Sequence, residues 1–319
     1  MSRLAIVLLL VWPTTLWADP FFWRHEWPGT DFTRSAVPWI EIRSGGPPRD
    51  GIPALDDPPT VPVAAAELTP DEAVVTVARP GRPARAYPIR YLIWHEIVND
   101  TIGRVPVAVT YCPLCNSFVV FDRRVGDRVL SFGVTGKLRH SDMVMYDRET
   151  ESWWQQATGI GIVGAQTGTE LDRFATWMEP FDAFAAAHPD GEVMAQPAWP
   201  RAYGRNPYDG YDGLPRPFLY SGELPPHGIA PLARVVRVGD AAWPMARIRA
   251  AGRLREDGLI LSWEAGMASA LDDTSVAGGR DVGHVRVRAA DGGDVVHDVM
   301  FAFAFQAFHP QGVWHVTAD

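Results

Sequence analysis

Cysteine and lysine are both scarce in this sequence of 319 residues, which contains two cysteines and a single lysine, Lys137. Two cysteines are too few for a small fold held together by a disulfide framework. The 29 basic residues are outnumbered by 38 acidic ones, so the net charge is −9 and the chain lacks the positive field that attracts nucleic acid. Hydrophobic residues make up 47% of the chain and charged residues 21%, which excludes a disordered or fibrous protein.

Long hydrophobic runs are missing beyond the N-terminus, so we expect no transmembrane span in the mature chain. Residues 1–18 have the features of a signal peptide: Arg3, an apolar run from Leu4 to Trp12, and a small residue, Ala18, before a plausible cleavage point. We therefore expect cleavage near Ala18 and a mature protein that is periplasmic or secreted. Cysteines tend to oxidise in such a compartment.

The motifs of several common enzyme classes are also absent. There is no glycine-rich phosphate loop, so no nucleotide cofactor is expected, and there is no Gly-X-Ser-X-Gly elbow. His95-Glu96 lacks a second histidine at the metalloprotease spacing, because position 99 is asparagine. The sequence leaves open whether the protein is an enzyme, and which small molecule or protein is its partner.

The residue pattern predicts a mainly β (α+β) fold, with one β-rich domain over 70–319, a few short helices and long loops rich in proline and glycine. Residues 19–69 are expected to form an irregular N-terminal arm that packs through its aromatic side chains, and residues 197–231 a long loop. No internal repeat is evident. Helices are expected at 89–99 and 179–187. Strands are expected at 74–78, 105–111, 118–122, 129–134, 143–146, 233–238, 259–263, 284–288, 295–305 and 313–316.

The two cysteines lie three positions apart in Cys112-Pro-Leu-Cys115, between runs of β-branched and aromatic residues. These flanks place the pair at the tip of a hairpin and not at the start of a helix, where thioredoxin-like pairs lie. A Cys-Pro-X-Cys turn followed by a residue that tolerates positive φ, here Asn116, is typical of a metal knuckle. Such a knuckle supplies two thiolates, and a closed tetrahedral site needs four ligands.

His95 is the best candidate for a third ligand, with Glu96 beside it, because both belong to an otherwise apolar predicted helix. A histidine in such a place is also commonly a hydrogen-bonded core residue. His140 with Met143 or Met145 would suit copper, but alternation places both methionines on one face of a strand, which favours a core role. The candidate metal is a single copper, zinc or iron ion.

Two other hypotheses for the protein stay open. In an oxidising compartment Cys112 and Cys115 could form a small disulfide, either structural or cycling in thiol–disulfide exchange. The third hypothesis is a non-catalytic module that binds a ligand or partner through a tryptophan-rich surface.

A second group of polar and aromatic side chains follows a predicted strand. Asp147, Arg148, Trp154 and Gln156 are candidates for a pocket in which Gln156 contacts a polar ligand. The competing interpretation is a charged turn followed by tryptophans of the core.

Several long motifs occur in order along the chain: Tyr87-Pro-Ile-Arg-Tyr-Leu92, His95-Glu-Ile-Val-Asn-Asp100, Val107-Ala-Val-Thr-Tyr-Cys-Pro-Leu-Cys115, Phe132-Gly-Val-Thr-Gly136, Met145-Tyr-Asp-Arg-Glu-Thr150, Trp154-Gln-Gln156, Tyr203-Gly-Arg-Asn-Pro-Tyr208, His297-Asp, Phe301-Ala-Phe303 and Gln306-Ala-Phe308. Together they resemble the family called domain of unknown function 3179, over about residues 55–316. The resemblance implies one domain in which the His-Glu and Cys-Pro-Leu-Cys elements belong to one pattern, and it implies no activity. Asn116 and His140 depart from that pattern, where glycine and asparagine are usual.

Overall fold

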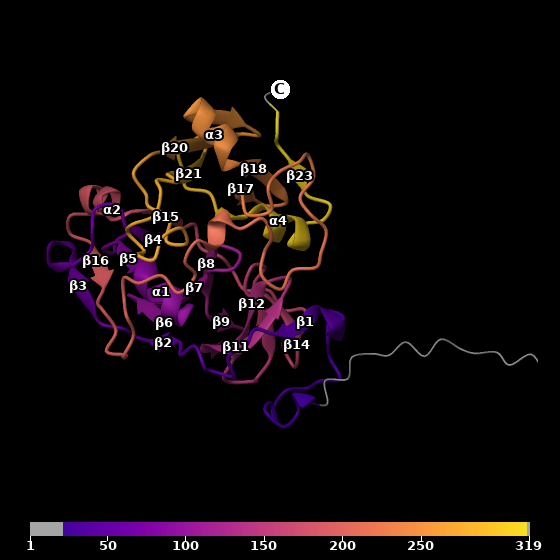
Figure 1. Ribbon diagram of the computed structural model, residues 1–319. Coiled ribbons are helices and arrows are strands. Elements are labelled where there is room, and N and C mark those ends of the chain that lie inside the picture. The colour runs from indigo at the N-terminus through magenta and orange to yellow at the C-terminus, as the bar shows by residue number, and fades with distance from the viewer. Residues whose placement is uncertain (1–21, 318–319) are drawn as a thin grey trace, which may run out of the picture.

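The computed structural model describes residues 22–317, so the predicted signal peptide at 1–18 lies outside the described part of the chain. Strands hold 36% of the residues and helices 13%, and the five larger sheets form a propeller-like ring (Figure 1). This confirms the prediction of a single, mainly β domain. Among the described residues, no helix is long and apolar enough to cross a membrane.

One part of the ring, here called unit one, combines two sheets and two helices. Helix α1 (Ile89–His95) follows β5, and α2 (Phe181–Ala187) follows β15. The first sheet has the order β15 (Trp177–Pro180), β4 (Ala73–Val77), β5 (Arg85–Pro88), β16 (Glu192–Met194) and β3 (Thr60–Pro62). The second sheet contains β2 (Leu55–Asp56), β6 (Ile97–Ile102), β7 (Val105–Cys112) and β8 (Ser117–Asp122).

A second part, here called unit two, repeats this arrangement. Helix α3 (Met245–Ala251) follows β18, and α4 (Ala302–Phe308) follows β22. Its first sheet has the order β22 (Asp298–Phe301), β17 (Arg234–Val238), β18 (Ala241–Pro244) and β23 (Val313–Trp314). Its second sheet contains β19 (Arg253–Glu256), β20 (Leu259–Glu264) and β21 (His284–Ala289). In both units the last strand, β16 or β23, pairs in parallel with the strand before the first helix.

The backbone geometry of the two units matches in detail. Helices α1 and α3 both end at a residue with positive φ, Glu96 at 60° and Gly252 at 66°. Helices α2 and α4 end at His188, with φ −134° and ψ 64°, and at His309, with φ −131° and ψ 61°. The expectation that the chain has no internal repeat is therefore wrong. The clearest trace in the sequence is a short pattern, Phe-X-Ala-X-His-Pro-X-Gly, at 184–191 and 305–312.

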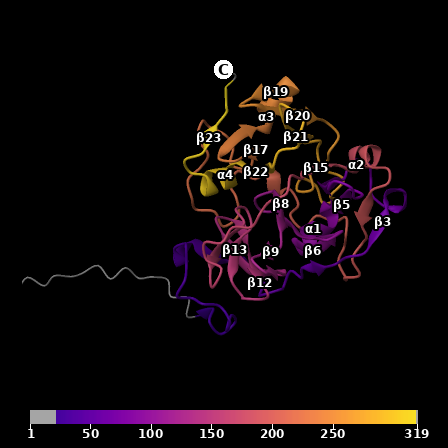
Figure 2. The same cartoon turned by 180° about the vertical axis from the view of Figure 1, so that it is seen from behind.

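The two units pack against each other reciprocally. Strand β8 of unit one contacts β22 of unit two, and β21 of unit two contacts β15 of unit one. Figures 1 and 2 show unit two, in orange and yellow, above β5 and β6 of unit one, in purple. The shared core therefore depends on both units at once.

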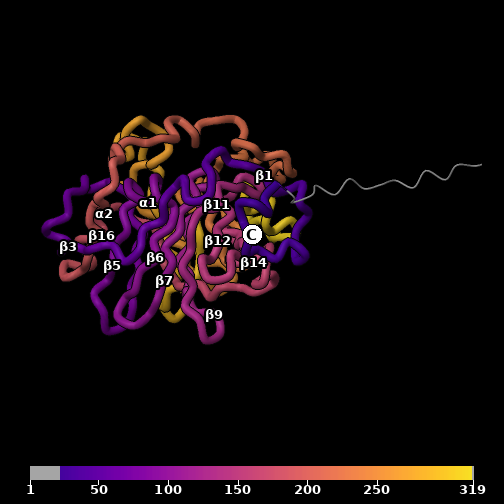
Figure 3. The backbone as a smooth tube through the Cα atoms, turned by 90° about the horizontal axis from the view of Figure 1, so that it is seen from below, coloured from indigo at the N-terminus to yellow at the C-terminus, as the bar shows by residue number. Residues whose placement is uncertain are grey.

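Unit one carries an insertion between β8 and β15 that unit two lacks. It consists of a small hairpin, β9 (Arg124–Val125) and β10 (Arg128–Val129), and most of a five-stranded sheet. That sheet has the order β1 (Ile42–Ser44), β11 (Phe132–Arg139), β12 (Asp142–Asp147), β13 (Trp153–Gln155) and β14 (Ile160–Val163). The side chain of Asn99 on β6 joins it to unit one, with 2.8 Å hydrogen bonds to both the N–H and the C=O of Phe132. Figure 3 shows β11 beside β6 in the backbone trace.

Three sequence predictions of secondary structure need correction. The helix expected at 89–99 ends at His95, because Glu96 adopts positive φ, and residues 97–102 form β6. The strand expected at 295–305 is β22 followed by α4, a helix buried on so many sides that it shows no apolar stripe. Helix α3 was not predicted. The long loop expected at 197–231 contains one 3-10 turn, at Tyr211–Gly213.

The segment expected to be an irregular arm contributes β1, β2 and β3 to three different sheets, with 3-10 turns at Trp39–Glu41 and Val63–Ala65. Trp27 is fully buried against the inserted sheet. The only lysine, Lys137, places its Nζ 3.1 Å from Glu26 and between 5.1 and 5.7 Å from the ring centroids of Trp23, Trp27 and Trp153. This partly buried ion pair among aromatic rings joins the arm to β11.

His297, just before β22, is only 3% exposed. Its ring nitrogens lie 2.8 Å from the carbonyl oxygen of Val295 and 3.4 Å from that of Val285. Burial lowers the pKa of His297 below its ordinary value of 6.5, against the opposing effect of these hydrogen bonds. The unfolded chain therefore binds more protons than the native protein below that pH. The stability that depends on a neutral His297 is complete above about pH 6.5 and is lost as the pH falls toward the lowered pKa.

We expect the free energy of unfolding of the wild type, measured with urea, to fall more between about pH 7.5 and pH 5.5 than that of His297→Gln. His227→Gln, at an exposed histidine, should keep the wild-type pH dependence. Equal slopes for the wild type and His297→Gln would contradict the assignment.

Candidate metal centre

The cysteine pair lies at the turn between β7 and β8, which confirms the predicted hairpin tip. Cys112 is the last residue of β7 and pairs with Ser117, the first residue of β8. Asn116 has φ 49°, the left-handed conformation that the sequence predicts for it. Cys112 and Cys115 are free thiols, 1% and 0% exposed.

A third acidic donor comes from the inserted sheet. Strands β11 and β12 are joined by a two-residue turn in which His140 and Ser141 have φ 53° and 63°, and this turn delivers Asp142 to the cysteines. Asp142 Oδ1 accepts a 2.8 Å hydrogen bond from the thiol of Cys115. Its Oδ2 accepts hydrogen bonds from Gln155 Nε2 at 2.6 Å and from the backbone N–H of Ala157 at 2.9 Å. These two bonds fix the carboxylate and leave Oδ1 toward the sulfurs.

Cys112, Cys115 and Asp142 together form a cluster with metal-ligand spacing. One donor atom of each lies within 4.8 Å of those of the other two, and all three residues are buried. Two sulfurs bound to one tetrahedral zinc ion, each at about 2.3 Å, lie about 3.8 Å apart. The cluster therefore has the size that a single ion requires, and we call it the cysteine–aspartate cluster.

The electrostatics of the cluster favour a bound cation. Burial raises the pKa of Cys112, Cys115 and Asp142 above their ordinary values, and the neighbouring acidic groups add to the rise for the two thiols. Burial, helped by the charge of Asp142, raises the pKa of Glu96 to about 8. Among residues 22–317, no basic side chain forms an ion pair with Glu96 or Asp142. A cation would supply the missing countercharge.

Glu96 stands beside the cluster in an unusual backbone conformation. It is 7% exposed, and its φ of 60° and ψ of −32° are costly for a residue with a side chain. Unit two has Gly252 at the equivalent place, with φ 66° and ψ −41°. Unit one thus holds a buried carboxylate at a position where unit two has glycine, and such a backbone outlier makes Glu96 a candidate functional residue.

The structure does not bring His95 into the cysteine–aspartate cluster. Its Nδ1 lies 2.7 Å from the carbonyl oxygen of Pro53, and its Nε2 lies 2.6 Å from the hydroxyl of Tyr203. Both ring nitrogens therefore have hydrogen-bond partners, as in the core-histidine interpretation. Asp142 was missed as a donor because it meets the cysteines only through the β11–β12 turn, a contact across 27 residues that no spacing rule reveals.

The side chains of the second group of candidate residues contact other parts of the protein. Asp147 accepts a 2.8 Å hydrogen bond from Nε1 of Trp154, which is fully buried, and Arg148 forms a 2.7 Å ion pair with an aspartate on β2. Gln156 lies behind the cysteine turn, where its Oε1 accepts a 3.2 Å hydrogen bond from Ser117. Met143 and Met145 are buried, as the core interpretation predicts.

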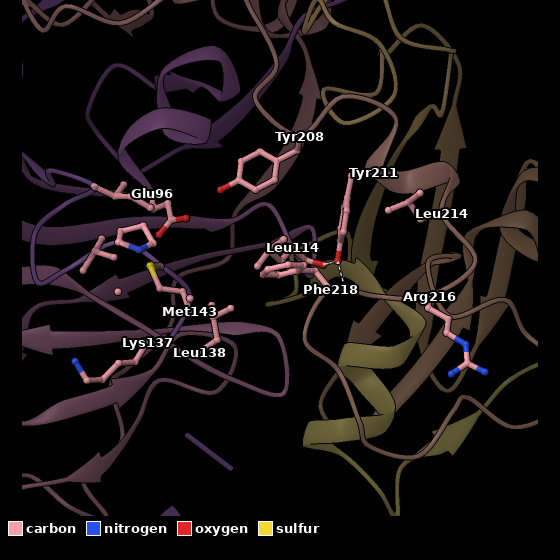
Figure 4. Close-up of a pocket in the computed structure, with 15 residues that line it drawn as sticks. Glu96, Leu114, Lys137, Leu138, Met143, Tyr208, Tyr211, Leu214, Arg216 and Phe218 are labelled. Atoms are coloured by element: carbon pink, nitrogen blue, oxygen red, sulfur yellow. Dashed lines mark hydrogen bonds between the residues drawn. The ribbon is translucent and has the colours of Figure 1, made fainter. Parts of the chain in front are cut away.

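A cavity of about 440 Å³ opens next to Glu96 and Leu114, the residue between the two cysteines of the turn (Figure 4). Its walls come from the inserted sheet, the arm and the 197–231 loop. A volume of this size is in the range of small-molecule sites. None of the four predicted pocket residues lines this cavity.

Fold and site together define a propeller-like β protein with a buried cluster of thiols and a carboxylate beside a cavity. Residues 49–312 match the model of the family described as protein of unknown function (DUF3179), well over half of the chain. The chain belongs to this family, which confirms the resemblance. Comparisons with curated proteins and with solved structures gave no match.

Replacing Glu96 by glycine should stabilise the metal-free protein, because it removes both a buried acid and a side chain in a left-handed conformation. We expect Glu96→Gly to raise the free energy of unfolding by about 1 kcal/mol or more in urea titrations with EDTA. Asp257→Gly, at an exposed turn residue with φ 50°, is the control for backbone strain alone and should have a smaller effect. A destabilised Glu96→Gly protein would show that the side chain serves packing.

Proposed function

We propose that the protein binds one divalent cation at Cys112, Cys115 and Asp142. The observation that carries this proposal is that three acidic donors converge without a basic partner among the described residues. Buried acids in that arrangement are destabilised in their charged forms, and a cation removes the penalty. Glu96 lines the cavity, and it lies close enough to the cluster for the charge of Asp142 to raise its pKa.

The donor set ranks the candidate metals. Two thiolates with one carboxylate oxygen form a mixed soft and hard set, which suits zinc, and then ferrous iron. Copper(I) prefers sulfur and imidazole ligands. Here the third donor beside the two thiols is the carboxylate of Asp142, and His95 lies outside the cluster, so the donor set is less suited to copper(I). Zinc is therefore the first candidate.

Three protein ligands leave one position of a tetrahedral ion open. An open position is what distinguishes catalytic from structural zinc sites, because water or a substrate occupies it. None of the three ligands lines the cavity, but Leu114 lies between the two cysteines in the chain and the charge of Asp142 acts on Glu96. We propose that a molecule in the cavity reaches the open position past these two lining residues. When bound, the ion would act as a Lewis acid there.

Thiol–disulfide exchange is the alternative function for the same two cysteines. It requires a thiolate near ambient pH, and redox-active pairs lower the thiol pKa with a helix N-terminus or a basic neighbour. Here the pair lies in a hairpin turn and burial raises the pKa of both thiols. A coordinating metal ion deprotonates the thiols itself, whereas exchange needs a thiolate before any partner binds, so these features favour metal binding over exchange.

Elemental analysis of the purified, untagged protein tests the metal site. We expect about one equivalent of zinc in the wild type, and its loss in Cys112→Ser and in Asp142→Asn, because each removes one of three protein ligands. His95→Gln and Asp147→Asn should keep the metal, since their hydrogen bonds lie outside the cluster. Asp147→Asn is the matched control, because Asp147 is also a buried strand aspartate.

Full metal occupancy in Cys112→Ser, or loss of metal in His95→Gln with retention in Asp142→Asn, would refute the ligand set. No metal in the wild type, with a disulfide detected by thiol titration, would replace the proposal by the redox alternative.

We further propose that the protein is exported, on the basis of the signal-peptide features of residues 1–18. N-terminal sequencing of protein isolated from cells should find a chain that begins near Asp19. An intact Met1 in all of the protein would exclude cleavage.

A further inference from the structure

The cavity beside the cluster has mostly apolar walls. Leu138 and Met143 come from the inserted sheet, Ile52 from the arm, and Tyr211 and Phe218 from the 197–231 loop. The loop thus forms one wall of a cavity that the cysteine turn borders through Leu114. Such a lining selects a ligand with a large apolar surface.

Most polar side chains around the cavity are already engaged. The hydroxyl of Tyr211 donates a 2.8 Å hydrogen bond to the carbonyl oxygen of Leu114 and accepts one from the N–H of Phe218 at 3.2 Å. Lys137 turns its Nζ away to Glu26. Arg216 is exposed at the far side from Glu96 (Figure 4).

Two polar side chains at the inner end have no hydrogen-bond partner among the described residues. They are the carboxyl group of Glu96 and the hydroxyl of Tyr208, which Figure 4 shows on the same side of the cavity. Both are available to a polar group on a bound molecule. A polar group that entered the cavity elsewhere would meet apolar atoms and lose its hydrogen bonds to water.

The charge of the site disfavours an ionised ligand. Two thiolates and Asp142 carry three negative charges, one more than a divalent cation neutralises, and Glu96 is a further acid. A carboxylate at the inner end would be repelled and desolvated, and an ammonium group would lose its water shell between apolar walls. An uncharged hydroxyl or carbonyl group would replace its hydrogen bonds to water by hydrogen bonds to Glu96 and Tyr208, at little net cost.

We infer that the cavity binds an uncharged, mainly apolar small molecule whose hydroxyl or carbonyl end contacts Tyr208 and Glu96 next to the cysteine–aspartate cluster. This inference rests on the proposed function in placing that polar end at the metal and in the charge count that excludes an ionised ligand. Occupation of the cavity itself is measurable without any metal.

The apolar part of the inference is tested with N-phenyl-1-naphthylamine, an uncharged probe that fluoresces in apolar surroundings. We expect saturable binding of one probe per wild-type protein, and at least tenfold weaker binding in Leu138→Trp and in Ile52→Trp, which fill the cavity. Val313→Trp adds the same side chain at an exposed site on β23 and should bind like the wild type. Two filling variants are used because one of them could fold poorly.

The polar end is tested by displacing the probe with 1-octanol, octanoate and octylammonium. We expect octanol to displace it at concentrations at least tenfold lower than either ion. Tyr208→Phe should weaken the octanol effect about five- to tenfold, the cost of one hydrogen bond, without changing probe affinity. Tyr220→Phe is the matched control, because the hydroxyl of Tyr220 donates its hydrogen bond to the carbonyl oxygen of Glu223, outside the cavity. This variant should leave the octanol effect unchanged.

No saturable probe binding, or binding unchanged in both filling variants, would overturn the cavity assignment. Octanoate or octylammonium displacing the probe as well as octanol would overturn the assignment of an uncharged ligand. Probe binding that survives in Cys112→Ser, together with unchanged metal content in that variant, would refute the metal site and leave the cavity inference standing.

Discussion

The burial of acidic groups without a countercharge is the constraint around which this structure is organised. Two thiols, the carboxylate of Asp142 and that of Glu96 meet where the inserted sheet joins unit one. Such a meeting opposes folding, because each ionised group raises the cost of ionising the next. It persists because rigid elements enforce it: the cysteine hairpin, the turn at His140 and the two hydrogen bonds to Asp142 Oδ2.

The same constraint explains why the site lies at a junction of three parts of the chain. The cysteines come from unit one, Asp142 from the insertion, and the cavity is covered by the 197–231 loop. Unit one and the insertion would each expose their acidic groups to water if they stood alone. Water is excluded from these groups only when the parts assemble. The proposed cation site, the proposed site for an apolar molecule and the packing of the inserted sheet therefore depend on the same contacts.

Local patterns in the sequence predict what is decided locally. The hairpin position of Cys112 and Cys115 and the left-handed backbone of Asn116 follow from the neighbouring residues, as does the β-rich fold. The end of α1 did not follow, because glutamate gives no stop signal and the left-handed conformation is imposed by its surroundings. Asp142 reaches the thiols through tertiary contacts, and His95 finds its partners in two distant loops, so neither arrangement has a sequence signature.

The repetition of the fold has a consequence for how freely its two halves can vary. Unit two keeps Gly252 in the turn where unit one holds Glu96, and it lacks the inserted sheet. Unit two therefore has the repeated fold without the buried glutamate and without the inserted sheet, and it supports unit one by packing against it. Tolerance to substitution should therefore be unequal across the molecule. It should be broad around α3 and β19, and narrow at the corresponding turn of unit one, where a buried glutamate adopts a costly backbone conformation.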